Sequence, residues 1–374
     1  MAEEIIHKYL DEMLKQDASD MYLSVGYPPS IRNKEGRVVP MTKVTLRQED
    51  IEKIMDDVLD DDKKDEFEST LELNISIARD SDGSRFRLNF LRQQQKSGII
   101  IRRISTIIPT IEELQLPQIY ADIIMKRRGL IILASQGGSG KSTSMAAMLG
   151  HRNHHGWGHV LTIEDPIEFV HEQGKCIFTQ REVGSDTFSY GMALKNALRQ
   201  RADVIAIGEI RDRESMDHAL RFAETGHLCI ATLHSNNASQ AVDRIVNFFP
   251  DESRQYILST LSQNLLAIFS QRLLHNVSGG NSLAIEMLLN EGIVKTLIAD
   301  DKLADIREAI ERGRNVGMQT FDQALVDLFS KGEITLDAAL SESDNPSALK
   351  LKINQGNLGN MELNRASRAN KEDF

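Results

Sequence analysis

The sequence predicts an α/β protein in which a small α+β domain precedes a larger domain with a mostly parallel sheet and a helical C-terminal portion. Three observations lead to this prediction. Short strand-like segments and hairpin signals fill residues 1–104. Between residues 118 and 340, apolar runs alternate with helical stretches, which is typical of a parallel sheet covered on both faces. One of these runs leads through a glycine-rich loop directly into a helical stretch.

The first 104 residues predict helices and short strands in a domain of ordinary size. A helix is expected at residues 3–15 and an acidic helical stretch at 48–68. Strands are expected at 21–25, 31–39 (interrupted by a turn at 34–36), 71–79, 85–91 (the last two joined by a turn at 80–83) and 98–104. Residues 105–117, which carry two prolines, are expected to be the interdomain linker.

Residues 118–340 predict the larger domain. Its expected strands are 130–134, 159–163, 203–207 and 228–232, and its first clear helix is 142–149. From about residue 251 to 340 the periodicity is mainly helical, with Leu258, Leu261, Leu265 and Ile268 on one face. Residues 341–374 are rich in Asn and Ser and show no sustained period, so they are expected to be a disordered or loosely docked tail.

The composition is ordinary for a globular chain and narrows the classes of function. The 374 residues include 44 Lys and Arg against 55 Asp and Glu, a formal charge of −11, and 41% are hydrophobic. Disorder of the whole chain is therefore excluded, and the acidic balance disfavours a general polyanion binder. The two cysteines, Cys176 and Cys229, are too few for a disulfide framework or a four-cysteine zinc site and are expected to be buried thiols.

No segment predicts membrane insertion or export. Apolar runs such as 99–101 and 130–134 are far shorter than the roughly 18 residues that a membrane span needs. The N-terminus is acidic and leads into an amphipathic stretch, unlike a signal peptide. We therefore expect a cytoplasmic protein that can dock on a membrane complex.

The clearest motif is the segment 137–143, between a buried strand and a helix. Backbone N–H groups of such a loop point at phosphate oxygens, a lysine reaches the β- and γ-phosphates, and a serine hydroxyl holds Mg²⁺. The predicted ATP-binding residues are Gly137, Gly138, Ser139, Gly140, Lys141, Ser142 and Thr143, with Ser142 also a Mg²⁺ ligand. The alternative is a glycine-rich strand-to-helix turn with an incidental lysine, which the strand–loop–helix context disfavours.

Ser135 departs from the usual phosphate-loop pattern, which has glycine at this position. A serine forced to a positive φ would cost about 1 kcal/mol or more. We expect Gly137 to form the turn instead, because the loop has two adjacent glycines. Whether the serine lowers the rate of ATP hydrolysis does not follow from the sequence.

Acidic and histidine side chains follow three other strand-like runs. Glu164 and Glu168 come at the end of the run 159–163, Glu209 follows the run 203–207, and His234 follows the run 228–232. Carboxyl ends of parallel strands face the crevice where ligands bind. The carboxylates are candidates to orient or deprotonate water, with Glu209 in the acidic position that contacts Mg²⁺ or the attacking water, and His234 is a candidate phosphate sensor. The alternatives are a solvated strand end and a structural histidine.

These motifs in this order resemble the secretion ATPases of the type II and type IV pilus superfamily. The most similar branch is the PilT/PilU family of twitching-motility retraction ATPases, and within it PilU. The resemblance runs from about residue 11 to 340 and includes 18–20, 26–29, 85–87, 162–169, 208–212, 225–235 and 317–322. The chain lacks the four-cysteine zinc module and the long N-terminal extension usual in the assembly ATPases, which favours the retraction branch.

The resemblance implies a PAS-like N-terminal domain, a RecA-like ATPase domain and a homo-hexameric ring. ATP would lie between the N-terminal domain of one subunit and the RecA-like domain of its neighbour. The implied catalytic arginines are Arg85, Arg87, Arg102 and Arg211. Arg85 and Arg87 alternate with apolar residues, so both lie on one strand face, where they can neutralise phosphate charge. The alternative is a solvated basic face.

The implied function is a hexameric, ATP-hydrolysing motor that powers pilus retraction at the inner-membrane pilus machine. The implied partners are an inner-membrane platform protein and a PilT-type paralogue, with no direct membrane insertion. An alternative is a slow or non-hydrolysing accessory subunit that supports a PilT-type motor. Ser135 is the sequence feature in favour of this alternative. A further alternative is a RecA-like nucleic-acid translocase. The acidic balance and the lack of a basic run with interleaved aromatic residues argue against it.

Overall fold

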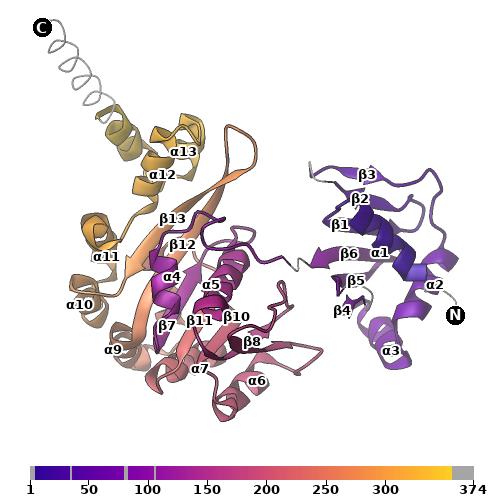
Figure 1. Ribbon diagram of the computed structural model, residues 1–374, viewed down its shortest axis with the longest axis horizontal. Coiled ribbons are helices and arrows are strands. Elements are labelled where there is room, and N and C mark those ends of the chain that lie inside the picture. Colours follow the sequence, from indigo (N-terminus) through magenta and orange to yellow (C-terminus); the bar gives the residue numbers. More distant parts are fainter. Residues whose placement is uncertain (1–4, 34–35, 80–82, 105–106, 356–374) are drawn as a thin grey trace, which may run out of the picture. The chain divides into compact units, whose positions relative to one another are not determined.

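The computed structural model describes residues 5–33, 36–79, 83–104 and 107–355 (Figure 1). These residues form two compact units, one within 1–107 together with 168–170, the other within 108–167 and from 171 onward. Most of the predicted turns at 34–36 and 80–83, linker residues 105–106 and tail residues 356–374 lie outside the described residues.

The first unit is built on a six-stranded antiparallel sheet in the order β3-β2-β1-β6-β5-β4. Its strands are β1 (Asp20–Ser24), β2 (Ser30–Arg32), β3 (Val38–Pro40), β4 (Glu72–Ala78), β5 (Arg85–Gln93) and β6 (Lys96–Ile104). Three helices accompany it: α1 (Ile5–Lys15), α2 (Gln48–Val58) and α3 (Asp61–Thr70). Strict alternation along β5 buries Phe86, Leu88 and Phe90 in the core and turns Arg85 and Arg87 to the other face.

The single helical stretch expected at 48–68 is divided into two helices. Helix α2 ends at Val58, and the Asp60 side chain accepts a hydrogen bond from the Lys63 N–H at the start of α3. Such a cap satisfies one of the unpaired donors at a helix N-terminus and fixes where the second helix begins.

The second unit contains a seven-stranded sheet in the order β13-β12-β7-β11-β10-β8-β9. Its strands are β7 (Gly129–Ala134), β8 (Gly158–Glu164), β9 (Cys176–Glu182), β10 (Val204–Ile210), β11 (Leu228–Leu233), β12 (Leu265–His275) and β13 (Asn281–Leu289). All neighbours pair in parallel except β12 and β13. Every residue of β7 and β11 is buried, so both faces of the central sheet are covered. The predicted mixed α/β class is confirmed.

Among its described residues, the second unit has ten bounded helices and a further helical segment at 346–355. These ten are α4 (Ile119–Ile124), α5 (Lys141–His155), α6 (Tyr190–Ala197), α7 (Arg213–Glu224), α8 (Ala238–Asn247), α9 (Arg254–Asn264), α10 (Ile293–Ala299), α11 (Ile306–Arg312), α12 (Phe321–Ser330) and α13 (Leu336–Glu342). From β7 to β11 a helix follows each strand except β8, which leads to β9 without an intervening helix.

The expectation of mainly helical structure from 251 to 340 is wrong at its centre. Helix α9 ends at Asn264, and Leu265 and Ile268 lie on β12, which forms a hairpin with β13 and pairs with β7. Residues 265–269 form a continuous apolar run, and such a run fits a buried strand as well as a helix segment. Strand β9, at the opposite edge of the sheet, was not expected either.

The expectation of a disordered tail from residue 341 is wrong for the part that the structure describes. Helix α13 continues to Glu342, and residues 346–355 are helical. Leu349 and Ile353, one turn apart, are buried against α12 in a small cluster with Phe321 and Leu325. Two apolar side chains in an otherwise polar segment were too weak a pattern to predict this docking.

Both cysteines are buried free thiols, as expected. Burial raises the pKa of Cys229 and also that of Cys176. Among the described residues, we find no helix with the length and apolar character that crossing a membrane requires.

Truncating Leu349 tests the docking of the tail. The Leu349→Ala variant should lower the free energy of unfolding by about 2–4 kcal/mol, because it leaves a cavity against α12. Urea denaturation of the full chain measures this difference. Leu351→Ala is the control, since Leu351 is exposed. Equal stabilities of the two variants would contradict the packing of this segment.

Candidate functional site

Four parallel strands bring the predicted site residues to one edge of the sheet. Strands β7, β11, β10 and β8 are neighbours, and their carboxyl ends lie at the same edge. Leu233 of β11 is paired with Ala134 of β7 and with Ile210 of β10, so the segments that follow these strands begin level with one another. This edge is where ligands bind in sheets of this type.

The glycine-rich loop between β7 and α5 takes its turn at Gly138 and Gly140. Their φ angles are 75° and 89°, in the left-handed region that favours glycine. Gly140 is the N-cap of the 15-residue helix α5, so the N–H groups of the first turn lie at the loop. The Lys141 ammonium donates to the carbonyls of Ser135 and Gln136, at 2.8 and 2.7 Å. Loop and lysine together form a site suited to anionic oxygens.

Ser135 is not strained, contrary to the concern raised by its departure from the pattern. Ser135 does not have a positive φ; Gly137 lies in the turn with Gly138, and the left-handed φ falls at Gly138 rather than at Gly137. The buried Ser135 hydroxyl donates to the Ala134 carbonyl and accepts from the backbone N–H of Gln271 at 2.9 Å. The serine therefore ties the start of the loop to β12.

Gln271 extends this contact into a buried polar network that sequence reasoning missed. Its side-chain amide donates to the Ser144 hydroxyl at 2.7 Å and lies 3.4 Å from the Tyr120 hydroxyl. Ser144 is on the first turn of α5, so β12 is bonded to both ends of the loop. Gln271 lies 136 residues after Ser135, and only the pairing of β12 with β7 could have indicated the contact.

Glu209 is the centre of an ion-pair network at the end of β10. One carboxylate oxygen lies 2.8 Å from His234 Nε2, and the other accepts from Arg211 Nε at 2.6 Å. Arg211 also reaches Asp165 at 3.2 Å, and its pairing with Glu209 raises the pKa of the guanidinium. The His234 ring lies beside the phosphate loop, because a Cβ on Gly137 would be 3.9 Å from its Cε1. The structure thus brings together Glu209, His234, Arg211 and the loop.

Gly208 allows β10 to approach β8 closely where the register between β10 and β11 shifts. A Cβ on Gly208 would lie 3.0 Å from the Tyr190 hydroxyl and 3.1 Å from Glu164 Cα, so a larger residue would force the strands apart. Burial, followed by the charge of Asp165, raises the pKa of the Tyr190 hydroxyl, which therefore stays protonated.

The two carboxylates of the predicted acidic motif differ in their surroundings. Glu164 is buried at the end of β8 and accepts from the Thr162 hydroxyl at 2.6 Å and from Gln180 at 3.3 Å. Glu168 is exposed and belongs with residues 169 and 170 to the first unit. Of these two carboxylates, Glu164 is therefore the one that belongs to the second unit, at the same sheet edge as Glu209.

The three arginines of the first unit lie on the outer face of its sheet. Arg87 and Arg102 are direct partners across β5 and β6, and Arg85 lies on the same face of β5. Arg102 Nε donates to Asp20 at 2.8 Å, which raises the pKa of the guanidinium, and its side chain is 70% exposed. Asp20 is also paired with Arg32 at 3.5 Å, so Arg32 and Asp20 belong to this basic face although they were not predicted.

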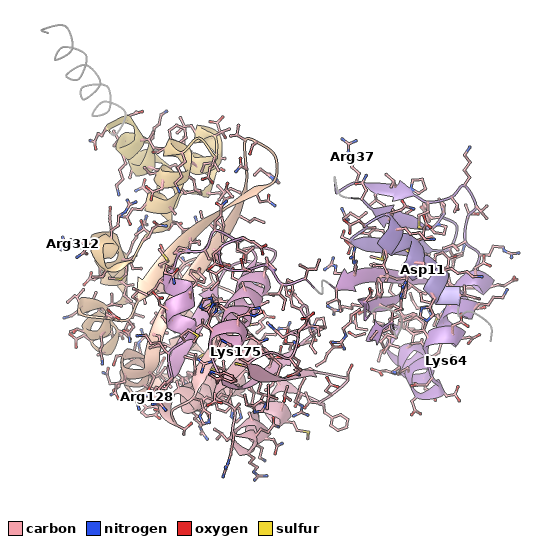
Figure 2. The ribbon with its side chains drawn as sticks, viewed as in Figure 1. Asp11, Arg37, Lys64, Arg128, Lys175 and Arg312 are labelled. Carbon is pink, nitrogen blue, oxygen red and sulfur yellow. The ribbon has the colours of Figure 1, made fainter. Side chains whose placement is uncertain are left out.

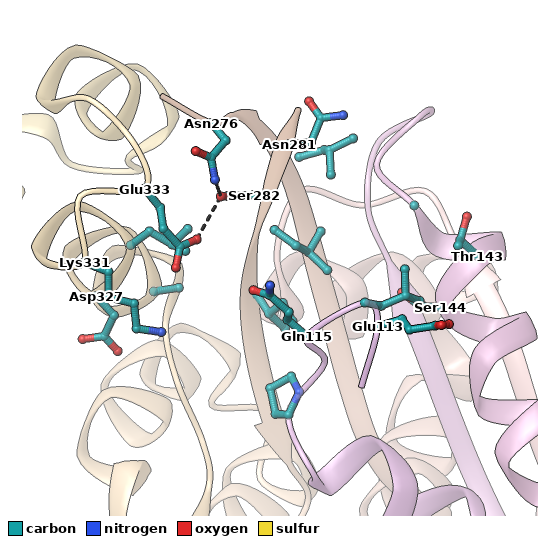
Figure 3. A pocket seen from close by; sticks show the side chains of 18 of the residues that line it. Glu113, Gln115, Thr143, Ser144, Asn276, Asn281, Ser282, Asp327, Lys331 and Glu333 are labelled. Atoms are coloured by element: carbon teal, nitrogen blue, oxygen red, sulfur yellow. Dashed lines mark hydrogen bonds between the residues drawn. The ribbon is translucent and has the colours of Figure 1, made fainter. Parts of the chain in front are cut away.

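A cavity of about 760 Å³ adjoins the phosphate loop (Figure 3). Its wall includes Gly140 and Thr143 from the loop and Gln115 from the segment before α4. Opposite them, Asn276 donates to the Ser282 hydroxyl and Ser282 donates to Glu333, as the dashed lines in Figure 3 show. The cavity is large enough for a small organic ligand and offers both amide and hydroxyl groups.

No metal centre is built from protein ligands alone in the part of the chain that the structure describes, where no three His, Cys, Asp or Glu residues are grouped suitably. The hydroxyls of Ser142 and Thr143 are half-buried at the start of α5 and make no hydrogen bond to a described residue. These hydroxyls are suited to bind a cation whose other ligands are phosphate and water oxygens, which is how Mg²⁺ is usually bound beside nucleotides.

Residues 1–283 match the family model described as Type II/IV secretion system protein. The type IV pilus ATPase PilU of Pseudomonas aeruginosa is 45% identical over 350 residues, which cover 93% of this chain and 91% of that protein. The type IV pilus retraction ATPase PilT of the same organism is 39% identical over 332 residues, 89% and 96% of the two chains. A crystal structure of the pilus retraction motor PilT with bound ADP has a TM-score of 0.86 at 36% identity, covering 92% of this chain and 98% of that one.

Replacing Ser135 tests whether the serine stabilises or strains the loop. Ser135→Gly should lower the free energy of unfolding by about 1–3 kcal/mol, because the buried Gln271 N–H loses its acceptor, and it should not increase ATP turnover. Thermal unfolding and a phosphate-release assay measure the two quantities. Ser135→Ala, which removes the hydroxyl without adding backbone freedom, is the control. A tenfold rise in turnover in Ser135→Gly would restore the interpretation of a strained loop.

Proposed function

The chain belongs to the Type II/IV secretion system protein family and, within it, to the PilT/PilU pilus retraction ATPases, and we propose that it is a hexameric motor that couples ATP hydrolysis to pilus retraction and twitching motility. The single observation that carries the proposal is the meeting of the phosphate loop with the Glu209–His234 pair at one sheet edge. It supplies an anion site and an oriented carboxylate in the same place.

ATP binding uses the loop and the adjoining cavity. The N–H groups of residues 138–143 and the Lys141 ammonium bind the β- and γ-phosphates, and Lys141 exchanges its bonds to the loop carbonyls for bonds to phosphate. The cavity beside Thr143 accepts the nucleoside. Mg²⁺ would be held by Ser142 and Glu209, and when bound it neutralises negative charge on the phosphates.

Hydrolysis is assigned to the carboxylates at the ends of β8 and β10. His234 and Arg211 each bond one oxygen of Glu209, which fixes the carboxylate so that it can orient the attacking water. Glu164 is the second candidate base, because it is buried and held by Thr162. His234 lies beside Gly137 and contacts Glu209, so it can report the state of the phosphates to the carboxylate.

The arginines of the first unit are assigned to the nucleotide of a neighbouring subunit. Arg85, Arg87 and Arg102 are presented on one open sheet face, where planar guanidinium groups can bind phosphate oxygens. Such sharing requires an adjacent subunit, and we propose a homo-hexameric ring in which each subunit has one. Hydrolysis and product release would then move the two units as rigid bodies, and this motion is the output of the motor.

The partners proposed are a PilT-type paralogue and the inner-membrane platform protein of the pilus machine. The chain would act as a peripheral protein on the cytoplasmic side of that machine, without binding nucleic acid. A slow accessory subunit is the alternative, and the only sequence feature in its favour was Ser135. Since Ser135 does not have a positive φ, that support is withdrawn.

Two substitutions at the sheet edge separate nucleotide binding from hydrolysis. Lys141→Ala should abolish ATP turnover, because it removes the charge nearest the phosphates. Glu209→Gln should bind ATP with nearly unchanged affinity but lose roughly 100-fold or more in turnover, because the amide cannot act on water. Phosphate release and calorimetric titration measure these quantities. Normal turnover in Glu209→Gln would disprove the role given to Glu209.

Mixing an impaired variant with an inactive one tests whether the arginines act between subunits. Arg102→Ala should reduce turnover, and adding Lys141→Ala subunits should restore part of it, because mixed rings contain some sites with both residues intact. Arg37→Ala is the control, since Arg37 is an exposed arginine of the same unit that extends into solvent (Figure 2). The absence of recovery at every mixing ratio would argue against shared sites.

A further inference from the structure

The C-terminal segment 341–355 is attached to β12 by Arg272. The guanidinium donates to the Glu342 carbonyl, pairs with Asp344 at 2.7 Å and lies over the Phe321 ring at 3.9 Å from its centroid. The side chains of Arg272 and Asp344 are 17% and 20% exposed, so solvent screens this pair less than a surface ion pair. Arg272 is therefore held in one orientation by the tail.

The same guanidinium contacts the loop that carries His234. It donates to the Asn236 carbonyl at 3.3 Å, and the Asn236 side chain accepts from Gln136 Nε2 at 3.0 Å. The Gln136 carbonyl in turn accepts from Lys141. A series of five residues, Asp344, Arg272, Asn236, Gln136 and Lys141, thus joins the tail to the phosphate loop through side-chain and main-chain bonds, and Asn236 and Gln136 flank the predicted phosphate site.

Glu286 provides a second bond between the same elements. It is buried on β13, on the face that it shares with Arg272, since Ser270, two residues before Arg272, is its direct partner. Its two oxygens accept from the N–H groups of Ala238 at 2.8 Å and Phe321 at 3.4 Å, the first residues of α8 and α12. The loop 234–237 is therefore fixed from both sides to the β12–β13 hairpin and α12.

Asp344 also belongs to a polar cluster with residues of α11 and α12 that fixes the start of the tail. Arg307 pairs with Asp322 at 2.8 Å and lies 3.9 Å from Asp344. The Ser343 hydroxyl donates to Asp322 at 2.7 Å. Residues 343 and 344 are therefore held in a defined position, so the Asp344 carboxylate is fixed beside the Arg272 guanidinium.

We propose that Asp344 and Arg272 are positioning residues through which the tail 341–355 sets the nucleotide affinity of the phosphate loop. This inference rests on the proposed function, because it concerns regulation of the same nucleotide site. Asp344 forms an ion pair with Arg272, Arg272 donates a hydrogen bond to the loop 234–237, and Asn236 of that loop accepts a hydrogen bond from Gln136. Removing the charge of Asp344 breaks the ion pair that orients the Arg272 guanidinium, so the loop at Gln136 is held less firmly and binds phosphate less tightly.

The test measures binding of Mg²⁺-ADP to the full chain by calorimetry, so that hydrolysis plays no part. Asp344→Asn should weaken ADP binding about fivefold, in the range of moderate couplings between sites. Asp344→Glu, which keeps the charge, should recover at least half of that loss. Asp337→Asn is the matched control, because Asp337 is an exposed acidic residue of the same region that makes no ion pair with a described residue.

A double-mutant cycle separates positioning from simple stabilisation. In an Asn236→Ala background the link to Gln136 is already broken, so adding Asp344→Asn should weaken ADP binding by less than twofold. An equal loss in both backgrounds, or wild-type affinity in Asp344→Asn, would overturn the proposal. Failure of the wild-type chain to bind ADP in a Lys141-dependent way would instead refute the proposed function, so the two failures are distinguishable.

Discussion

The parallel register of β7, β11, β10 and β8 is the constraint on which the site depends. Each strand contributes one part of the chemistry from its carboxyl end: the phosphate loop, the His234 loop, Glu209 and Glu164. Because the central strands are buried on both faces, a slip of one residue in any strand would place each side chain in space shaped for another and would move the carboxyl end of that strand out of line with its neighbours. The buried central strands therefore hold the four ends level, and the register shift at Gly208 brings Glu209 to the network.

Much of this edge could be predicted because its signals are local. Apolar runs, the glycine-rich loop and the polar residues after each run are all readable within short windows, and the parallel sheet then brings them together. Gln271 and Arg272 could not be found in this way. They lie on β12, in the segment expected to be helical, so their side chains were assigned to the wrong element. The pairing of β12 with β7 is a long-range contact that no short window contains.

Two details show where a motif is a poor guide to geometry. The departure from the pattern raised the question of strain at Ser135, but the left-handed turns fall at Gly138 and Gly140 and the serine hydroxyl bonds to β12. In the first unit, alternation along one strand indicated Arg85 and Arg87 correctly as a pair on one face. The pairing of Asp20 with Arg32 and Arg102 depends on which strands lie beside β1, and alternation along one strand could not indicate it; Arg102 is 82 residues away in sequence.

The burial of both thiols makes the chain suited to site-specific labelling. A thiol reacts as the thiolate, and burial raises the pKa of Cys176 and of Cys229, so both are protonated and shielded at neutral pH. A cysteine introduced at the exposed position of Leu351 would be the only accessible nucleophilic sulfur. A fluorophore or spin label could then follow the helix 346–355 in real time, with both native cysteines left in place.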